Sequence, residues 1–339
     1  MQASLLFEQL IAKHHLSPTQ MQSVIQSCMS GELTDVQIAT FLALMRSKGE
    51  TVEELTAAAS AMRSFAHYLE LGDHLIDIVG TGGDQKNTFN VSTASGFVVA
   101  ASGVKVAKHG NRSVSSQSGS ADLLERAGFK LHLDDEAVKT CIAQCNIAFL
   151  YGPQYHPAMQ NVRTARQQLG IRTIFNLLGP LLNPAQVKRQ ILGVYARKWM
   201  QPLADVLVNL GSERILVIHS QDGMDEISIA AETDVLEYHN EHFYQWSLNP
   251  ADYDIRHQNL DGITVRSSSE SLDMIWSVLS GKKNAARDMV LLNSAAAIYC
   301  AHDHLSFKDA LEKAALAIDS GKAAEHFKKL QQLTVKLAK

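Results

Sequence analysis

Long apolar runs, a surplus of basic residues and closely spaced cysteines are all missing from this chain of 339 residues. No apolar run approaches the roughly 20 residues of a membrane-spanning helix, so we expect no membrane association. The 31 Lys and Arg against 35 Asp and Glu leave a net charge of -4, which argues against a general nucleic-acid binder. Glu8 and Gln9 interrupt the first apolar residues, so no signal peptide is predicted and the cytoplasm is the expected location.

The four cysteines, Cys28, Cys141, Cys145 and Cys300, are too few for a disulfide framework. Cys141 and Cys145 stand four residues apart in a predicted helix, a spacing that lacks the close pair typical of zinc sites. Since a free cysteine packs as a small hydrophobic side chain, we expect four buried thiols.

Two structural regions follow one another along the chain. The first 70 residues predict four short helices, one begun by Ser17 with Pro18 and another by a capping box of Thr51 and Glu54. From Leu75 onward, short apolar runs alternate with helical stretches, which predicts an α/β domain with a mostly parallel sheet. The expected strands are 75–79, 104–107, 129–133, 148–151, 190–195 and 214–219, followed by a hairpin over 235–248 and mainly helices after residue 268.

The composition agrees with two domains. With 46% hydrophobic and 19% charged residues the chain can bury a large core, and roughly 150 residues per domain would make about two domains. We therefore expect a helical domain at 1–70, joined by helices near 160–185, and an α/β domain at 71–339.

The first segment that carries chemistry reads Gly80-Thr81-Gly82-Gly83-Asp84 and follows the strand expected at 75–79. Three glycines allow a tight turn with positive φ, and a helix start is expected near Asn90. Backbone N–H groups of such a loop and helix start can bind phosphate, although a purely structural turn has the same pattern. A Walker loop and a dinucleotide fingerprint are both excluded, because no Gly-Lys-Ser/Thr follows and residue 85 is Gln85.

A second polar segment, 108–120, follows the strand expected at 104–107. It contains the cations Lys108 and Arg112 together with one histidine, one asparagine, two glycines and five serines. These groups can bind a polyphosphate, and the alternative is a solvated turn. Ligands of open parallel sheets gather at the carboxyl ends of the strands, so both loops are expected to share one site.

Asp225 and Glu226 lie just beyond the strand expected at 214–219. Paired carboxylates are ligands that suit Mg²⁺, which commonly bridges carboxylates and substrate phosphates, and the alternative is a solvated acidic turn. Arg166, on a predicted helix, can donate two parallel hydrogen bonds to a planar carboxylate or can simply lie on the surface. The apolar segment 171–184 predicts a buried turn or a dimer-facing segment rather than a catalytic one.

In this order, the segments resemble anthranilate phosphoribosyltransferases over nearly the full length of the chain. The resemblance implies a homodimer whose subunits have a small helical domain and a larger α/β domain. It also implies transfer of the phosphoribosyl group of 5-phosphoribosyl-1-pyrophosphate (PRPP) to the amino group of anthranilate, releasing pyrophosphate, in tryptophan biosynthesis. Two Mg²⁺ ions per subunit are implied as cofactors.

Position by position, the resemblance implies three sets of site residues. The metal set is Ser92, Asp225 and Glu226, and the anthranilate set is Gly80, Asn111 and Arg166. The PRPP-binding set is Gly80, Gly83, Asp84, Thr88, Asn90, Val91, Ser92, Thr93, Lys108, His109, Gly110, Asn111, Arg112, Ser113, Val114, Ser115, Ser116 and Ser120.

The chain departs from the family pattern at two positions. Gln85 replaces a common glycine, which implies a stiffer loop, and Arg163 replaces a usual small residue one turn before Arg166. The extra cation at Arg163 would aid anthranilate recruitment or change the acceptor preference. No general base is identified, and His109 is expected to shape the site by hydrogen bonding.

Two other functions compete with this one. A pyrimidine-nucleoside phosphorylase would share the fold, but Arg166 and the Asp225–Glu226 pair argue against it. A non-catalytic paralogue that binds nucleic acid would need a basic groove, which the net charge of -4 disfavours.

Overall fold

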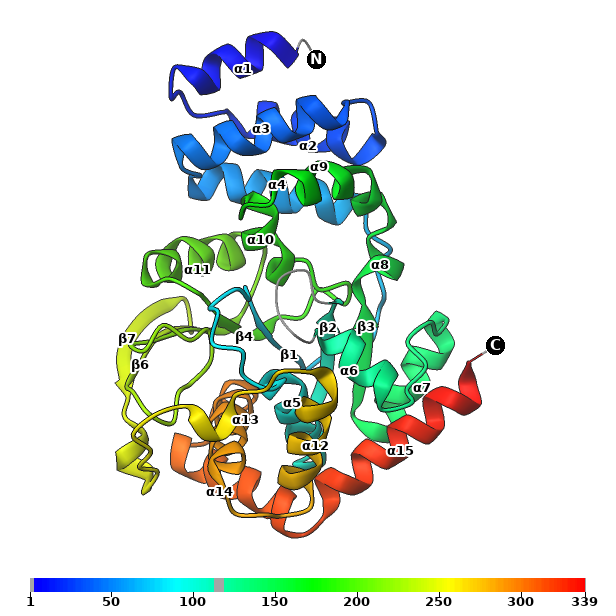
Figure 1. The fold of residues 1–339 in the computed structure, drawn as a ribbon, viewed down its shortest axis with the longest axis vertical. Helices are drawn as coiled ribbons and strands as arrows, with labels where there is room; N and C mark the ends of the chain where they lie inside the picture. Colours follow the sequence, from blue (N-terminus) through cyan, green and yellow to red (C-terminus); the bar gives the residue numbers. More distant parts are fainter. Residues whose placement is uncertain (1–2, 113–118, 339) are drawn as a thin grey trace.

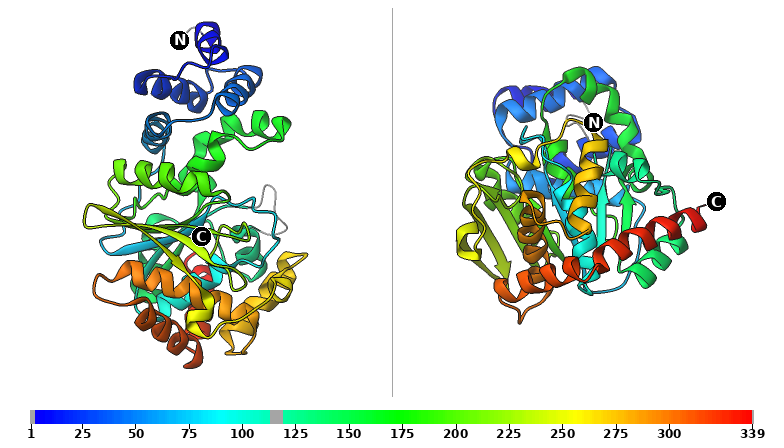
Figure 2. Two further views of the ribbon diagram at one scale, coloured as in Figure 1. Left: turned by 90° about the vertical axis from the view of Figure 1, so that its left-hand side faces the viewer. Right: turned by 60° about the horizontal axis from the view of Figure 1, so that its bottom comes forward.

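The computed structural model describes residues 3–112 and 119–338, and it places a layer of helices on one end of a larger α/β body (Figure 1). Both further views keep the N-terminal helices at one end of the molecule and α13 and α14 toward the other (Figure 2). The α-helices are α1 (Ala3–Ile11), α2 (Pro18–Ser30), α3 (Asp35–Lys48), α4 (Val52–Ser64), α5 (Val91–Ala101), α6 (Ser120–Arg126), α7 (Asp135–Cys145), α8 (Gly152–Tyr155), α9 (Arg163–Leu169), α10 (Ile174–Leu178), α11 (Met200–Asn209), α12 (Ser268–Leu279), α13 (Ala285–Ala301), α14 (Phe307–Asp319) and α15 (Lys322–Leu337).

One seven-stranded sheet, in the order β3-β2-β1-β4-β5-β6-β7, forms the centre of the α/β body. The first five strands in this order run parallel, and β6 and β7 add an antiparallel hairpin at one edge. Its turn residues Asn240 and Glu241 both have positive φ, as a tight two-residue hairpin turn requires. The strands are β1 (Leu75–Gly80), β2 (Lys105–Gly110), β3 (Ile147–Tyr151), β4 (Arg189–Gly193), β5 (Arg214–Ser220), β6 (Thr233–His239) and β7 (His242–Leu248). The mostly parallel sheet and the hairpin were both predicted from the sequence, and both are confirmed.

The two faces of the sheet belong to two hydrophobic clusters, as strand β5 shows. Successive side chains of a strand point to opposite faces. Ile215 and Val217 pack into the cluster formed by α1–α4 and α9–α11, whereas Leu216 and Ile218 pack into the cluster formed by α5, α7 and α12–α15. The N-terminal helices therefore share a continuous core with one face of the sheet. The division into domains at residue 70 stays a prediction.

The helix boundaries follow the capping residues. The Ser17 hydroxyl accepts from the N–H of Gln20, whose side chain accepts from Ser17 in return, and Thr51 forms the same capping box with Glu54. Gly31 ends α2 in the left-handed conformation, at φ 77°. The predicted starts of α2 and α4 are thus confirmed.

The strand predicted at 129–133 is wrong. Phe129, Leu131 and Leu133 are buried and the residues between them are exposed, which is the pattern of a strand. This segment nevertheless pairs with no strand of the described chain. Its apolar side chains pack into the cluster beneath α15, and the Lys130 N–H donates to Thr334 Oγ1 at 3.2 Å.

All four cysteines are free and buried, as predicted. The segment 171–184 folds into α10 and a short 3₁₀ turn, Gly179–Leu181, and most of its side chains are buried, which confirms the expected buried turn. Within residues 3–112 and 119–338, no helix is both long and apolar enough to cross a membrane.

Candidate active site

The glycine loop after β1 meets the acidic loop after β5 at the carboxyl edge of the sheet. The Gly82 N–H donates to Asp225 Oδ2 at 2.6 Å, so the loop backbone already binds one carboxylate. A Cβ atom on Gly80 would stand 2.5 Å from the same oxygen, which explains why this position lacks a side chain. Gly82 and Gly83 have φ of 68° and 77°, so the turn needs glycine for its backbone conformation as well.

Two buried carboxylates at this edge, Asp225 and Glu226, have raised pKa values. Burial and the neighbouring Asp84 raise the pKa of Asp225 to about 7. Burial, Asp225 and Asp84 together raise the pKa of Glu226 well above its usual value. Like charges gathered in a partly buried site favour protonation or the binding of a cation. The predicted metal-binding pair therefore lies next to Asp84, which the sequence had placed only in the PRPP set.

The start of α5 lies beside the carboxylate pair. The Ser92 backbone N–H lies close enough to the Glu226 carboxylate to lower its pKa, although burial outweighs this effect, so the helix N-terminus faces the acidic loop. Asn90 precedes the helix, and its side-chain oxygen accepts from Ser271 at 2.7 Å. Val91 and Thr93 are buried, and the Thr93 hydroxyl has no hydrogen-bond partner among the described residues.

The loop between Asp84 and α5 is held in a bent form. Gln85 and Asn87 both have positive φ, at 64° and 53°, although neither is glycine. Thr88 forms an isolated antiparallel bridge with Thr264. Gln85 thus has a backbone conformation that glycine adopts more readily than other residues.

Lys108, His109 and Gly110 lie within β2, not in the loop where the sequence analysis placed them. Lys108 is only 4% exposed, and its ammonium group donates to the Ile78 carbonyl oxygen at 2.7 Å. Burial lowers the pKa of Lys108, and the carboxylates of Asp77 and Glu226 oppose this change. The lysine therefore supplies its charge from beneath the site, beside Glu226.

His109 is hydrogen bonded through both ring nitrogens. Nδ1 bonds to the Asp77 carboxylate, and Nε2 lies 3.0 Å from the Gly179 carbonyl oxygen. Asn183 donates to Asp77 at 2.8 Å. Neither ring nitrogen is free to take a proton from a substrate, and the segment 171–184 supplies two partners of this buried network.

The rest of the second polar segment is described only at its ends. Asn111 Oδ1 accepts from the Arg112 N–H at 2.7 Å, and Ser120 begins α6 with its hydroxyl 3.4 Å from the Asn111 carbonyl oxygen. Arg112 donates to Glu125 at 2.7 Å, so its charge is already paired on the surface. A side chain on Gly110 would overlap with Ser120 Oγ. The expected PRPP ligands Ser113, Val114, Ser115 and Ser116 lie outside the described residues.

Arg166 projects from α9, which packs against α3. Its guanidinium lies over the Phe175 ring, 5.3 Å from the ring centroid, and burial lowers its pKa. Among the described residues it has no hydrogen bond and no carboxylate partner. Arg163, at the start of the same helix, is exposed. Arg166, unlike Arg163, is therefore a partly buried cation that can receive an anion.

Arg172 is a second such cation, and the sequence analysis missed it. It lies in the segment that we expected to be non-catalytic, and its guanidinium stacks 4.1 Å from the Tyr195 ring centroid. A Cβ atom on Gly83 would stand 2.8 Å from its Nη2 atom. The signal in the sequence was a lone arginine at the start of a strongly apolar segment.

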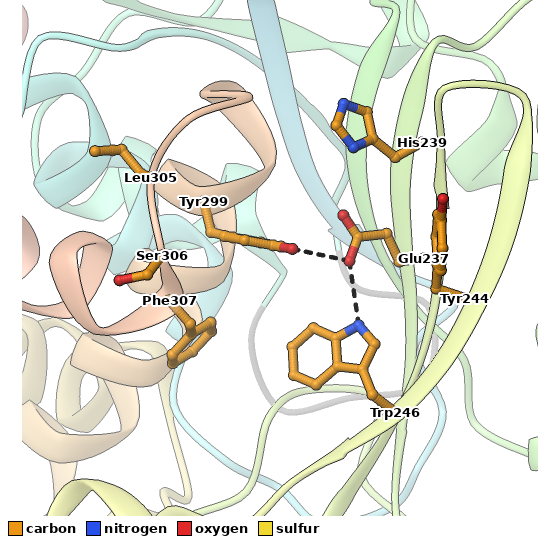
Figure 3. A pocket seen from close by; sticks show the side chains of 8 residues that line it. All are labelled: Glu237, His239, Tyr244, Trp246, Tyr299, Leu305, Ser306 and Phe307. Carbon is orange, nitrogen blue, oxygen red and sulfur yellow. Dashed lines mark hydrogen bonds between the residues drawn. The ribbon is translucent and has the colours of Figure 1, made fainter.

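A cavity of about 600 Å³ lies away from this site, between the hairpin and the start of α14 (Figure 3). Its polar centre, Glu237, accepts from Tyr299 and Trp246 at 3.0 and 3.2 Å and also pairs with Arg214 at 2.9 Å. The Glu237 carboxylate thus has its hydrogen-bond partners within the protein, and the cavity is lined mainly by packed aromatic side chains.

Comparison with known proteins gives one consistent picture. The model described as "Glycosyl transferase family, helical bundle domain" matches residues 5–66, and "Glycosyl transferase family, a/b domain" matches residues 72–324. A protein of Legionella pneumophila (strain Paris) named anthranilate phosphoribosyltransferase is 65% identical over 100% of this chain and 98% of its own length.

Solved structures agree with the sequence relatives. The anthranilate phosphoribosyltransferase of Thermus thermophilus superposes with a TM-score of 0.91 at 36% identity, covering 99% of this chain and 100% of its own. The enzyme of Saccharomyces cerevisiae in complex with PRPP and Mg superposes with a TM-score of 0.90 at 28% identity, covering 99% of both chains.

Proposed function

Because the chain belongs to the anthranilate phosphoribosyltransferase family, we propose that it transfers the phosphoribosyl group of PRPP to the amino group of anthranilate. The products are N-(5-phosphoribosyl)anthranilate and pyrophosphate, in the biosynthesis of tryptophan. What supports this function most directly is the meeting of the glycine loop, the start of α5 and the Asp225–Glu226 pair at one edge of the sheet.

The PRPP site is proposed at the glycine loop and the start of α5. Free N–H groups at a helix start and in a glycine turn bind phosphate oxygens, and the positive end of the helix dipole adds to the attraction. Gly83 and Asp84 would contact the donor from the loop, and Lys108 would supply positive charge from beneath it. The other donor-binding positions are proposed as Gly80, Thr88, Asn90, Val91, Ser92, Thr93, His109, Gly110, Asn111, Arg112, Ser113, Val114, Ser115, Ser116 and Ser120.

The anthranilate site is proposed at Arg166, Asn111 and Gly80. The Arg166 guanidinium is held in a plane by the Phe175 ring, and its N–H groups are unused among the described residues. Planar guanidinium and carboxylate groups pair through two parallel hydrogen bonds. Anthranilate carries such a carboxylate next to its amine, so this pairing would fix the direction of the nucleophile.

The chain's residues fit a magnesium ion. Asp225 and Glu226 are hard oxygen donors, and their raised pKa values reflect uncompensated negative charge. Ser92 lies in the first turn of α5, beside Glu226, and its hydroxyl would be a third oxygen donor. In the part of the chain that the structure describes, no three His, Cys, Asp or Glu converge on one point. Water and substrate oxygens would therefore complete the coordination, as is usual for Mg²⁺. Two ions per subunit are proposed.

The reaction follows from these placements. As the bond from ribose C1 to pyrophosphate breaks, the leaving group gains negative charge and C1 becomes positively charged. Lys108 and the loop N–H groups would stabilise the leaving group, and bound Mg²⁺ would neutralise part of its charge. The anthranilate amine is an uncharged nucleophile, so no strong base is needed before attack. Arg166 and Asn111 would hold it against C1, and this positioning would supply much of the rate.

A cytoplasmic homodimer is proposed as the form in which the enzyme acts. Leu5 and Ile11 of α1 and Val36 of α3, two helices in contact with each other, are 67%, 57% and 75% exposed, which is a high exposure for large apolar side chains. A second copy of this helical surface would cover them. Analytical ultracentrifugation of the pure protein would show a dimer if this is correct and a monomer if it is not.

Anthranilate fluorescence tests the function itself. Mixing the pure protein with anthranilate, PRPP and Mg²⁺ is expected to remove the fluorescence, and omitting any one of the three is expected to preserve the signal. Turnover of a pyrimidine nucleoside with inorganic phosphate, without consumption of anthranilate, would reject the proposed function in favour of a phosphorylase.

A further inference from the structure

Arg172 is held in place from the helical layer. Its carbonyl oxygen accepts from Arg46 Nη1 of α3 at 2.5 Å, across 126 residues of sequence. Gly170 ends α9 in the left-handed conformation just before it. The backbone that carries Arg172 is therefore fixed relative to α3 and α9, on the side of the site where Arg166 also lies.

The guanidinium of Arg172 is oriented by an aromatic platform. It stacks 4.1 Å from the Tyr195 ring centroid, and the Tyr195 hydroxyl accepts from Trp199 Nε1 at 2.9 Å. The Tyr195 N–H donates to Thr81 Oγ1 at 3.0 Å, which attaches the platform to the glycine loop. Stacking fixes the plane of a guanidinium and leaves its edge free to donate.

The free edge of this guanidinium lies against the loop. A Cβ atom on Gly83 would stand 2.8 Å from Nη2 and 3.1 Å from Nε and Cζ. Gly83 is thus needed for this close approach as well as for its φ of 77°. Any anion bound to the loop N–H groups at Gly83 would lie within reach of Arg172.

No hydrogen bond or ion pair joins the Arg172 guanidinium to an anion among the described residues, although its charge lies near enough to Asp225 to counteract part of the rise in the pKa of that carboxyl. Other partly buried or buried arginines of the described chain use their N–H groups: Arg214 pairs with Glu237, Arg287 pairs with Asp319, and Arg63 donates to main-chain carbonyl oxygens. Arg166 and Arg172 differ from them, because neither guanidinium has a hydrogen bond or ion pair among the described residues. A cation removed from water without a partner is costly, so such a group is typical of a site that an anion completes.

Resting on the proposed function, we propose that Arg172 is a further substrate-binding residue, which binds the diphosphate group of the donor at Gly83. Arg46 and Tyr195 are positioning residues, because they act through Arg172. Arg166 and Arg172 then divide the two anionic substrates between them: the acceptor carboxylate binds over Phe175 and the donor diphosphate binds beside the glycine loop.

The test compares Arg172→Gln and Arg172→Lys with Arg256→Gln, a control at an exposed arginine that has no side-chain partner among the described residues. Calorimetry would measure the binding of inorganic diphosphate with Mg²⁺, and kinetics would give KM separately for PRPP and anthranilate. Arg172→Gln is expected to weaken diphosphate binding and raise the PRPP KM by about 10- to 100-fold, the range of one charge-assisted hydrogen bond. The anthranilate KM and the melting temperature are expected to stay close to those of the control. Arg172→Lys should lose part of the affinity, since it keeps the charge but not the planar fork.

Other results would overturn the proposal. A rise in the anthranilate KM with unchanged diphosphate binding would assign Arg172 to the acceptor, and a loss of folding in both variants would make its role structural. Diphosphate binding also separates this proposal from the proposed function. If the unaltered protein binds diphosphate through Arg172 but does not consume anthranilate, the arginine assignment stands and the acceptor assignment fails.

Discussion

The main-chain carbonyl oxygen of Asp225 occupies the space that a Cβ atom on Gly193 would need. Gly193 ends β4 and pairs with Gly80 at the end of β1, whose missing side chain makes room for the Asp225 carboxylate. Two glycines on neighbouring strands therefore let the acidic loop descend onto the sheet edge. The position of the Asp225–Glu226 pair therefore depends on the absence of side chains at Gly80 and Gly193 as well as on the acidic residues themselves.

Replacing Gly193 with alanine is expected to displace Asp225 and abolish turnover. The overlap is with backbone, which cannot rotate away, and overpacking of this kind costs about 1–3 kcal/mol or more of folding stability. Denaturant unfolding and the anthranilate assay would measure the two effects. Gly179→Ala is the matched control, because Gly179 has φ of -45° and open space where its Cβ would lie. A fully active Gly193→Ala enzyme would contradict this account of the site.

Magnesium binding is expected to depend on pH around neutrality. Burial and Asp84 raise the pKa of Asp225 to about 7, so Asp225 is partly protonated at neutral pH in the metal-free protein. Mg²⁺ must displace that proton, so its affinity should fall as the pH drops below 7. Titration calorimetry in buffers of different ionisation enthalpy would detect the released proton, and Asp225→Asn should abolish both binding and release.

Asp225 should also make the stability of the metal-free protein depend on pH. Mg²⁺ affinity is expected to rise with pH, whereas the stability of the metal-free protein is expected to fall. Since the folded pKa of Asp225 lies above its unfolded value near 4, the folded state binds more protons between these pH values, and stability falls as the pH rises toward 7. Asp225→Asn, which mimics the neutral acid, should therefore raise the melting temperature of the metal-free protein at neutral pH. Glu241→Gln, in the exposed hairpin turn, provides the control. An unchanged or lower melting temperature for Asp225→Asn would show that the charged Asp225 carboxylate does not destabilise the folded protein.

Arg166→Ala should raise the anthranilate KM while leaving the PRPP KM nearly unchanged. Losing a bidentate pair with a carboxylate corresponds to about 1.5–3 kcal/mol, or roughly a 10- to 100-fold effect. Arg163→Ala is the matched control, since Arg163 lies on the same helix but is exposed. Equal effects of the two substitutions would mean that the acceptor is attracted by general positive charge and not bound by Arg166.

Local patterns made the elements of the fold predictable. The capping boxes of α2 and α4 and the short apolar strands depend on residues that are close in sequence, so the sequence shows them directly. The error at 129–133 arose because alternating burial under α15 produces the same pattern as a strand in a sheet. Periodicity reports which side chains are buried, but it does not report what covers them.

The candidate site was predictable only where its parts are continuous in sequence. The glycine loop and the Asp225–Glu226 pair stood out as motifs, whereas Lys108 was placed in a loop although it lies in β2. Arg172 depends on Tyr195 and on Arg46, which is 126 residues earlier. The surroundings of a single arginine form only when the fold brings such distant partners together, so the spacing of residues in one sequence does not predict them.

The buried Asp77–His109 pair is expected to be the main electrostatic support of the site. Asp77 accepts hydrogen bonds from the His109 ring and from Asn183. Burial alone would raise the pKa of Asp77, but His109, Lys108 and Asn183 together lower it. Asp77→Ala would leave the His109 ring without its partner, and breaking a buried pair typically costs about 3–5 kcal/mol. Urea unfolding at neutral pH would measure the loss.

A second His–Asp pair in the same chain supplies the comparison. His67 and Asp135 lie 2.9 Å apart, but their side chains are 53% and 40% exposed, so Asp135→Ala should cost only about 0–1 kcal/mol. Because the pKa of Asp77 is lowered in the folded state, its contribution is complete above the unfolded value near 4 and is lost as the pH falls through the folded value. The stability of Asp77→Ala should therefore depend less on pH in the acid range than that of the unaltered protein. Similar losses for Asp77→Ala and Asp135→Ala would mean that burial does not strengthen the pair, and His109 would then need another explanation for its place beneath the site.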